Sequence, residues 1–308
     1  MAPARGGRVS ACVKPVRWLA LALGAVVCPL ALLGGVAVWG NHRAVEPPSR
    51  GELAASLERG VGWLEGNAAA LLEERNAVLW WMVREASQAT GDPRLSQLFQ
   101  RWEARYPSLQ KSIWNHLFDE ASTSSLALRE VEGLPYYDQF FFYGLTCDPR
   151  LGAVERIVRQ GEADFCDPLP YRLKPACVTH QLMGLRFMQR RRCGDPVKVA
   201  AVVAHLQDRI VGQLTWDPRV VDVYLQRVVM LVESGARARV RPVWIRRVLA
   251  AQRPDGGWSA DQPMVSLGSG RWLGFTQYGI GLARGRSNFH ATAQGVWLMS
   301  LLLNPEGG

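Results

Sequence analysis

Residues 193–196 read Cys-Gly-Asp-Pro, and two close variants occur earlier in the chain: Thr-Gly-Asp-Pro at 90–93 and Thr-Cys-Asp-Pro at 146–149. A degenerate fourth copy, Arg-Val-Arg-Pro, occupies 239–242, so that successive prolines lie 56, 47 and 46 residues apart. An Asp-Pro pair is typical of a helix start, because Asp caps the free backbone N–H groups and Pro fits the first turn. The tetrapeptides therefore predict a repeat in which each unit begins a new helix.

Each tetrapeptide stands between two helical stretches of different character. The stretches after the prolines are amphipathic, such as VKVAAVVAHLQDRI at 197–210, with a first one expected over 53–66. The others are more apolar and cover about 75–90, 135–146, 177–192, 219–235 and 289–303. This alternation predicts an all-α ring of about five helical hairpins, with a buried inner layer and a half-exposed outer layer. An open solenoid is the rival architecture, and no run alternates as several β-strands would.

The amphipathic stretch before residue 259 ends in Gln-Arg-Pro-Asp-Gly-Gly-Trp at 252–258. This string resembles the Q-W motif of triterpene cyclases and the equivalent turn of protein prenyltransferase β-subunits, and His-Ala-Thr-Ala-Gln at 290–294 resembles their last inner helix. The resemblance covers about residues 177–303 and implies an α/α-toroid. The cyclase D-x-D-D string is absent. Asp222 and His290 match two ligands of the prenyltransferase zinc site, but Tyr224 stands where its Cys belongs, so neither activity is implied.

The N-terminal segment indicates a compartment. An uncharged apolar run of 23 residues spans 18–40 and follows four basic residues and no acid. A helix of that length measures roughly 35 Å, enough to cross a bilayer. The charge asymmetry predicts a cytoplasmic tail over 1–17, a transmembrane helix over 18–40 and an extracytoplasmic location for the rest. We expect that rest to consist of a linker over 41–52 and the domain over 53–308 that resembles an α/α-toroid. A cleaved signal peptide is the alternative interpretation of 18–40.

The composition narrows the class of protein. The apolar fraction of 48% supports a packed core and excludes a wholly disordered chain. The net charge is +9, but the basic residues are spread along the chain, which argues against a nucleic-acid partner. Arg outnumbers Lys 32 to 4, typical of a GC-rich bacterial genome, so we expect a single-pass protein anchored in the bacterial inner membrane through 18–40.

Three chemically active residues are expected at equivalent places in successive hairpins. His180, Asp222 and His290 each begin an inner helix and point toward the end of the ring that carries the long loops. Two His and one Asp in that arrangement predict either a three-ligand zinc site with an open position or a His–Asp general base. The plainer interpretation is that Asp222 caps its helix and the two His bond neighbouring polar groups.

Aromatic and acidic residues near the same mouth are the candidate substrate-binding residues. They are Tyr136, Asp138, Tyr224, Trp258 and Trp272, the last of which lies in a glycine-rich loop over 259–287 that suits binding or gating. Two functions follow. One is an enzyme acting on a lipid-linked, glycan or peptide substrate, and the other is a non-catalytic binding or scaffold module of a cell-envelope complex. A deep polar pocket that unites the two His and Asp222 would favour the enzyme.

The hairpin map also predicts disulfides. In an oxidising compartment, the four cysteines after residue 41 allow three pairings. Cys147 and Cys193 lie in inner-to-outer links at one end of the ring, whereas Cys166 and Cys177 lie in or beside one loop at the other end. Helices of about 14 residues separate the two ends by roughly 20 Å. Since Cα atoms must lie within about 7 Å, the predicted pairs are Cys147–Cys193 and Cys166–Cys177.

Overall fold

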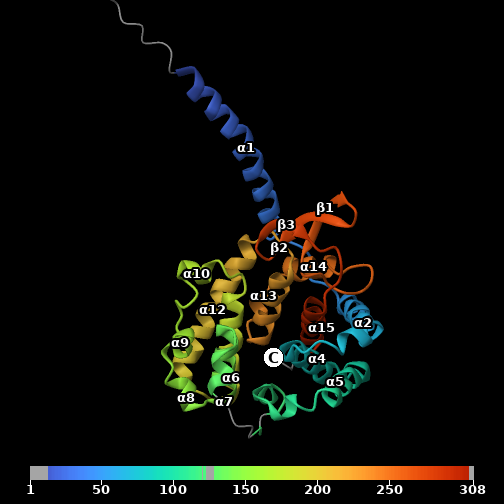
Figure 1. Cartoon of the computed structure of the whole chain (residues 1–308). Helices are drawn as coiled ribbons and strands as arrows, with labels where there is room; N and C mark the ends of the chain where they lie inside the picture. Colours follow the sequence, from blue (N-terminus) through green and yellow to red (C-terminus); the bar gives the residue numbers. More distant parts are fainter. Residues whose placement is uncertain (1–12, 120, 123–127, 305–308) are drawn as a thin grey trace, which may run out of the picture.

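The computed structural model describes residues 13–119, 121–122 and 128–304 and is mostly helical (Figure 1). Five helices form the centre of the domain: α4 (Ala77–Thr90), α7 (Tyr136–Thr146), α11 (Cys177–Arg191), α13 (Asp222–Glu233) and α15 (Phe289–Leu303). Around them lie α2 (Arg50–Gly66), α5 (Pro93–Arg105), α12 (Pro196–Trp216) and α14 (Pro242–Ala250). In the third unit, the outer position is taken by three short helices: α8 (Pro149–Gly152), α9 (Glu155–Val158) and η3 (Arg159–Gly161).

Short helices connect these elements. They are α3 (Ala68–Leu71), η1 (Leu109–Lys111), η2 (Ile113–Leu117), α6 (Leu128–Glu132), α10 (Leu169–Arg172) and η4 (Arg237–Arg239). Along the centre, α7 packs on α11, α11 on α13, α13 on α15, and α15 on α4, while η2 contacts both α4 and α7. The five central helices therefore surround a common axis.

The Asp-Pro tetrapeptides begin helices as predicted. In each of α5, α8 and α12, Pro is the first helical residue, and the Asp before it accepts a hydrogen bond of 2.8 Å from a backbone N–H of the first turn. The preceding helix ends in a left-handed residue, Gly91 at φ 68° or Cys147 at φ 51°. Pro242 also begins a helix, although Arg241 provides no side-chain cap.

Burial of the helices follows the predicted alternation. Every residue of α15 from Ala291 to Leu302 is buried, whereas α12 buries one face consisting of Val199, Val202, Val203, Leu206, Ile210 and Leu214. A helix that is apolar all round belongs inside, and an amphipathic one belongs at the surface. The inner and outer layers are therefore set by the apolar pattern of the sequence.

The prediction of an all-α fold is wrong in one segment. Within 259–287 the chain forms an antiparallel sheet of three strands in the order β1 (Gln262–Gly268), β2 (Arg271–Thr276) and β3 (Gly279–Ala283). The turn between β1 and β2 places Ser269 at φ 52° and Gly270 at φ 72°, the left-handed pair that a tight hairpin requires. The sequence does not reveal these strands for two reasons. They are rich in glycine, and two register shifts between β1 and β2 break the alternation of apolar and polar residues.

The prediction of a transmembrane helix over 18–40 is not supported. Residues Val13–Trp39 form helix α1, which projects from the domain (Figure 1). In the described part of the chain, however, no helix has both the length and the apolar character needed to cross a membrane. The prediction rested on the absence of charge over these 23 residues.

Residues 41–52 are more ordered than a linker. Asn41 is fully buried, and its side-chain amide donates a hydrogen bond of 2.8 Å to the backbone oxygen of Asp217. Helix α2 begins at Arg50, three residues before the predicted domain start, because Ser49 and Glu52 form a capping box there. The base of α1 is therefore fixed to the domain.

The Gln-Arg-Pro-Asp-Gly-Gly-Trp segment ties α14 to α2. The amide nitrogen of Gln252 donates to the backbone oxygens of Ser56 (2.9 Å) and Gly256 (2.8 Å). Gly256 has φ +95°, and a Cβ there would lie 2.5 Å from the backbone oxygen of Arg59. Trp258 is fully buried, and its indole N–H donates to the oxygen of Val248. The motif therefore closes the contact between the last outer helix and the first one.

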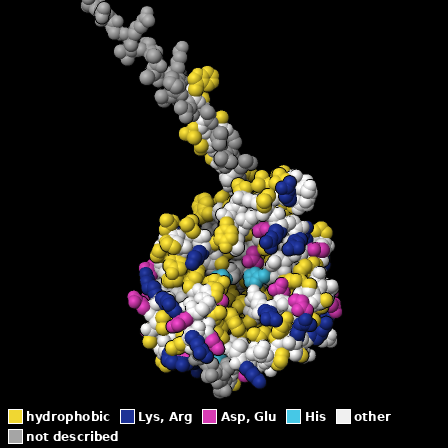
Figure 2. All heavy atoms as spheres, in the orientation of Figure 1, with side chains coloured by type: hydrophobic (Ala, Val, Ile, Leu, Met, Phe, Trp, Pro, Cys, Tyr) yellow, Lys and Arg dark blue, Asp and Glu magenta, His cyan; other side chains and the backbone are white. Residues whose placement is uncertain are grey.

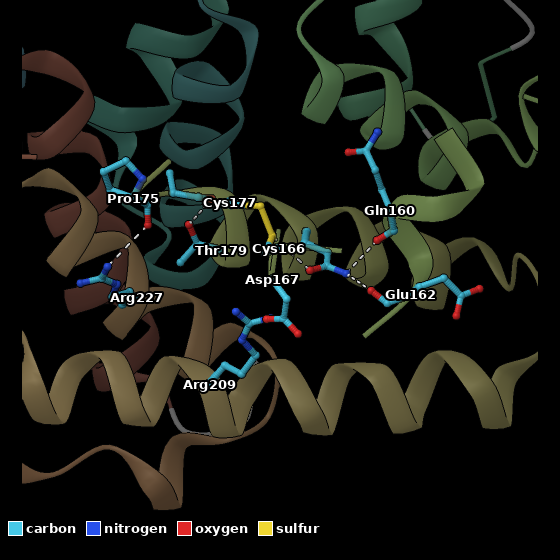
Figure 3. The surroundings of a disulfide bond; sticks show 11 residues. Gln160, Glu162, Cys166, Asp167, Pro175, Cys177, Thr179, Arg209 and Arg227 are labelled. Atoms are coloured by element: carbon cyan, nitrogen blue, oxygen red, sulfur yellow. Dashed lines mark hydrogen bonds and ion pairs between the residues drawn. A yellow bond between two sulfur atoms is a disulfide. The ribbon is translucent and has the colours of Figure 1, made fainter. Parts of the chain in front are cut away.

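Both predicted disulfides are present. Cys147 and Cys193 have Cα atoms 5.4 Å apart, and Cys166 and Cys177 have Cα atoms 6.0 Å apart. Figure 3 shows the second bond beside the loop that carries Gln160 and Glu162, whose backbone oxygens accept hydrogen bonds from the side-chain amide of Gln181. This pairing confirms the two ends of the hairpin map. It also fixes the first turn of α11, which carries His180.

Candidate active site

A cavity of about 380 Å³ lies at the N-terminal ends of the five central helices. Each helix contributes to its wall, and Gln277 from the turn between β2 and β3 contributes as well. Histidine side chains are visible at the centre of the face shown in Figure 2. The lining includes all three predicted catalytic residues, His180, Asp222 and His290, so the structure brings them to one polar pocket.

His290 and Asp222 form a hydrogen-bonded pair. The Nδ1 atom of His290 lies 3.0 Å from Oδ1 of Asp222, and both side chains are about one-quarter exposed. Asn288 caps α15 through the backbone N–H of Ala291, which places His290 in the first turn of that helix. Burial alone would lower the pKa of His290, but the charge of Asp222 and its hydrogen bond outweigh burial and raise it.

The pair fixes the tautomer of His290. An ionised carboxylate only accepts, so Nδ1 of His290 carries a proton and donates it to Asp222. In the neutral ring, the second nitrogen, Nε2, then bears a lone pair. Among the described residues, Nε2 has no hydrogen-bond partner. This is the arrangement in which a carboxylate orients an imidazole for proton transfer.

Two buried glutamines lie one helical turn after this pair. Gln294 follows His290, and its amide nitrogen lies 3.2 Å from Nδ1 of His290. Both groups are donors once Nδ1 carries the proton, so this contact is not a hydrogen bond. Gln226 follows Asp222 and accepts a hydrogen bond of 2.6 Å from the Thr179 hydroxyl. The amide oxygen of Gln294 is buried without a partner in the described part of the chain, although Gln294 lines the cavity. An acceptor left open there suits a donor group on a ligand.

His180 belongs to the cavity wall but not to the hydrogen-bonded pair. Its ring lies 4.3 Å from the ring of Tyr137 between centroids, at an interplanar angle of 30°, and 5.9 Å from that of Phe141. Burial, together with the charge of His290, lowers the pKa of His180 to about 4, against the opposing effect of Asp222. His180 is therefore a neutral imidazole at neutral pH, held on an aromatic surface.

Asp138 is a carboxyl group whose pKa is raised by burial. It lies in the first turn of α7 and lines the cavity next to Tyr137. A helix N-terminus favours a negative charge, yet burial dominates and raises the pKa of Asp138 to about 7. Burial also raises the pKa of Tyr137, with smaller contributions from the charge of Asp138 and from Tyr278. Asp138 can thus hold a proton near neutral pH.

The predicted zinc site is not formed. Within residues 13–119, 121–122 and 128–304, no group of three or more His, Cys, Asp and Glu side chains is close enough together to hold a metal ion. The reason lies in the two histidines, since Nδ1 of His290 is hydrogen-bonded to Asp222 while the ring of His180 packs against Tyr137. The three residues share one cavity without converging on one point.

Four of the five predicted substrate-binding residues lie outside this cavity. Only Asp138 lines it. Tyr136 packs on Tyr171 beside the ammonium group of Lys174, and burial raises its pKa to about 12. Tyr224 is fully buried under the guanidinium of Arg247.

The two tryptophans pack within the fold and do not line the central cavity. Trp258 is fully buried in the tie between α14 and α2. Trp272, half-buried in β2, lies so close to Gly285 that a Cβ there would come within 2.8 Å of its indole nitrogen. Neither indole is available to a ligand in the central cavity.

Several cavity residues were missed by the sequence reasoning. Polar ones are Gln226, Gln277 and Gln294, and aromatic ones are Trp114, Phe141 and Trp297. A usable signal was present for the two helical glutamines, since each lies four residues after a predicted site residue on an otherwise apolar helix. Residues at that spacing share a helix face. Gln277 had no such signal, because its place depends on the sheet.

Comparison with protein-family models, curated proteins and solved structures finds no match to this chain. The geometry of the cavity therefore carries the functional argument. Within the described residues, its main features are an oriented imidazole, a carboxyl group with a raised pKa and a buried amide oxygen without a partner.

Proposed function

We propose that the chain is an enzyme that uses the central cavity for general acid–base catalysis. The observation that carries this proposal is the His290–Asp222 pair at 3.0 Å, facing the same cavity as a carboxyl group whose pKa burial raises to about 7. A general acid or base works best when its pKa lies near the operating pH, and burial brings the pKa of Asp138 there. The polar pocket uniting His180, Asp222 and His290 favours this function over a scaffold with a filled centre.

Each residue has a role in this proposal. His290 is the general base and takes a proton from water or a substrate hydroxyl at Nε2. Asp222 is a positioning residue that holds the tautomer and stabilises the imidazolium that forms. Asp138 is the general acid and gives its proton to the oxygen of the leaving group. At the substrate atom under attack, the bond to the leaving oxygen breaks as the bond to the oxygen activated by His290 forms. One proton is taken by His290 and one is given by Asp138, so the step balances.

These roles predict a narrow pH optimum. His290 must be neutral, and its raised pKa sets the rising limb of the rate profile. Asp138 must be protonated, and its pKa of about 7 sets the falling limb. A bell-shaped profile near neutral pH follows.

The lining of the cavity supports a hydroxyl-rich substrate such as the end of a glycan. Asn76, Gln226, Gln277 and Gln294 provide amide groups, which both donate to and accept from hydroxyls. Tyr137 and Trp114 provide aromatic surfaces against the apolar faces of a sugar ring. A volume of about 380 Å³ is of the size that small-molecule sites have.

The proposal includes an extracytoplasmic compartment and an α/α-toroid architecture. Two disulfides support the compartment, because such bonds persist where the surroundings are oxidising. Five central helices around one cavity, with the Gln252–Trp258 tie between last and first outer helices, support the architecture. A cell-envelope glycan, free or lipid-linked, is then the substrate class within reach.

The test is conversion of envelope glycan fragments by the purified full chain, followed by mass spectrometry of the products. His290→Gln and Asp138→Asn should each reduce the rate by about 10²–10⁴-fold. His205→Gln, an exposed change on α12, is the matched control and should leave the rate unchanged. Binding of the same fragments is measured in parallel by calorimetry. Fragments that bind wild type and variants equally, without conversion, would refute the enzyme and establish the alternative, a non-catalytic binding module of the envelope.

A further inference from the structure

One face of the three-stranded sheet is apolar and exposed. Leu273 of β2 lies opposite Leu282 of β3 and Val265 of β1, and opposed residues in antiparallel strands share a face. Ile280 joins them, since it is two residues from Leu282 on the same strand. The exposed fractions are 55% for Val265, 40% for Leu273, 73% for Ile280 and 67% for Leu282. These four residues are called the sheet face below.

The sheet face inverts the usual pattern. A surface sheet places apolar side chains inward and polar side chains toward water. Here the inward side is occupied by the buried Gly274 and Ala283, while the outward side carries four large aliphatic groups. A continuous apolar patch of this kind marks a contact with another phase or molecule.

The surroundings of the sheet face extend this apolar surface. Helix α1 leaves the domain beside the sheet (Figure 1) and exposes Trp18, Leu21, Leu23, Val27, Leu32, Val36 and Trp39. At the foot of α1, the ring of His42 lies 6.0 Å from that of Trp216, whose side chain is also exposed. Figure 2 shows hydrophobic side chains gathered at this end of the domain.

The exposed charge beside the sheet face is mainly positive, although the carboxylate of Asp261 lies just before β1 and accepts from the backbone N–H of Arg284. Arg271, Arg284 and Arg286 are exposed in or directly after its strands, and within the described residues none of them forms an ion pair. Exposed aliphatic groups with tryptophans and arginines at their edge are the composition of surfaces that lie in the headgroup region of anionic bilayers. A second copy of the chain would bring the same arginines together, and like charges oppose that contact.

We infer that the sheet face docks on the surface of an anionic lipid bilayer. The four aliphatic side chains enter the boundary between headgroups and acyl chains, and the three arginines meet lipid phosphates. Because Gln277, in the turn between β2 and β3, lines the central cavity, this contact brings the mouth of the cavity beside the lipid surface. The inference stands independently of the proposed reaction, since it rests on exposure and charge alone.

The sheet is anchored firmly enough to transmit such a contact. The guanidinium of Arg219 donates to the backbone oxygens of Thr276 (3.2 Å) and Gln277 (2.9 Å), and Asp217 holds Arg219 at 2.7 Å. The same Asp217 accepts from Asn41 at the foot of α1 through its backbone oxygen. The sheet, the foot of α1 and the approach to α13 are therefore joined by one set of hydrogen bonds.

The test measures binding of the full chain to vesicles of pure phosphatidylcholine and of phosphatidylcholine mixed with phosphatidylglycerol. Hydrogen exchange of residues 262–283 is followed in the same samples. Wild type should bind the mixed vesicles more tightly, and these residues should gain protection there. Ile280→Asp/Leu282→Asp should weaken binding at least about tenfold and abolish the gain in protection, because two apolar groups are replaced by charges that lipid phosphates repel.

Val197→Asp is the matched control, since Val197 is equally exposed but lies on α12 next to Cys193, at the other end of the domain. It should bind like wild type. Ile280→Ser/Leu282→Ser, with its melting temperature, replaces the double Asp variant should that one fail to fold. Unchanged binding and protection in the double variants would overturn the inference. So would a dimer of the wild type without vesicles that the double variants lose, which would make a second copy the occupant.

Discussion

Replacing Asp138 by Asn tests whether the cavity stores a protonated carboxyl group. Asn has the same shape and no charge, so the variant removes only the ionisation. In the folded protein the pKa of Asp138 is raised from 3.8 to about 7, because burial penalises the carboxylate. Between these values the native state binds a proton that the unfolded state has lost. Stability therefore falls as the pH rises from about 4 to 7, and this loss should vanish in Asp138→Asn.

The magnitude follows from the shift. One pKa unit corresponds to about 1.36 kcal/mol, so the rise from pH 5 to pH 7 spans about 2.7 kcal/mol at full burial. Solvent around a half-buried side chain reduces this to about 1.5 kcal/mol. His180 acts in the opposite direction, because its pKa is lowered to about 4 and its unfolded state binds the extra proton below pH 6.5. The wild-type profile alone is therefore ambiguous, whereas its difference from the variant isolates Asp138.

The assay is urea unfolding of wild type and variant at pH 5 and pH 8. The variant should gain about 1.5 kcal/mol relative to wild type between the two conditions. Glu65→Gln, an exposed change on α2, controls for the loss of a negative charge. Parallel profiles for wild type and Asp138→Asn would refute the buried, protonated acid and remove the general acid from the proposed reaction.

Two further changes test the frame that holds the site. Replacing Cys147 and Cys193 by Ser should cost about 4 kcal/mol of unfolding free energy, and replacing Cys166 and Cys177 about 3 kcal/mol, because their sequence separations are 46 and 11. Urea unfolding ranks the pairs, and a reversed order contradicts the chain-entropy argument. Gly60→Ala should destabilise by roughly 1–3 kcal/mol, since its Cβ would meet Val296 at 2.7 Å, whereas Gly62→Ala meets nothing within 4 Å and should stabilise by up to about 1 kcal/mol. The melting temperatures of both variants are measured. A change of the same sign in the two variants would show that α2 and α15 move apart without cost and would contradict the predicted clash.

The sequence predicts the helical frame because local chemistry specifies it. Asp-Pro pairs carry their own hydrogen-bonding requirement, so Pro93, Pro149 and Pro196 begin helices whatever surrounds them. Once the helix ends are known, geometry limits which cysteines can meet, and the two observed disulfides follow. The common position of His180, Asp222 and His290 follows from the same map, since each lies in the first turn of an inner helix.

The sequence fails where the position of a side chain depends on contacts distant along the chain. Tyr224 and Asp222 are two residues apart on α13, yet one is fully buried under Arg247 and the other faces the cavity, because a shift of two residues turns the side chain by about 200°. The sheet depends on tight turns and register shifts, which the spacing of apolar residues in the sequence does not reveal. Whether His180 and His290 share a metal depends on ring orientations, which Tyr137 and Asp222 decide.

The polar residues of the cavity reduce the stability of the fold, and apolar residues at the same positions would stabilise it more. Helix α15 is buried on all sides from Ala291 to Leu302, and its Gln294 leaves an amide oxygen without a partner in the described residues. An apolar residue there would avoid the cost of an unsatisfied buried acceptor, about 1–3 kcal/mol. Asp138 adds a second cost, because burial opposes its ionisation. Both lie in the cavity that holds the His290–Asp222 pair, and sequences that fold well violate the packing rules mainly where a function requires it. Gln294 and Asp138 each reduce stability, and both line the cavity that holds the His290–Asp222 pair. Their cost and the geometry of the pair therefore indicate the same functional site.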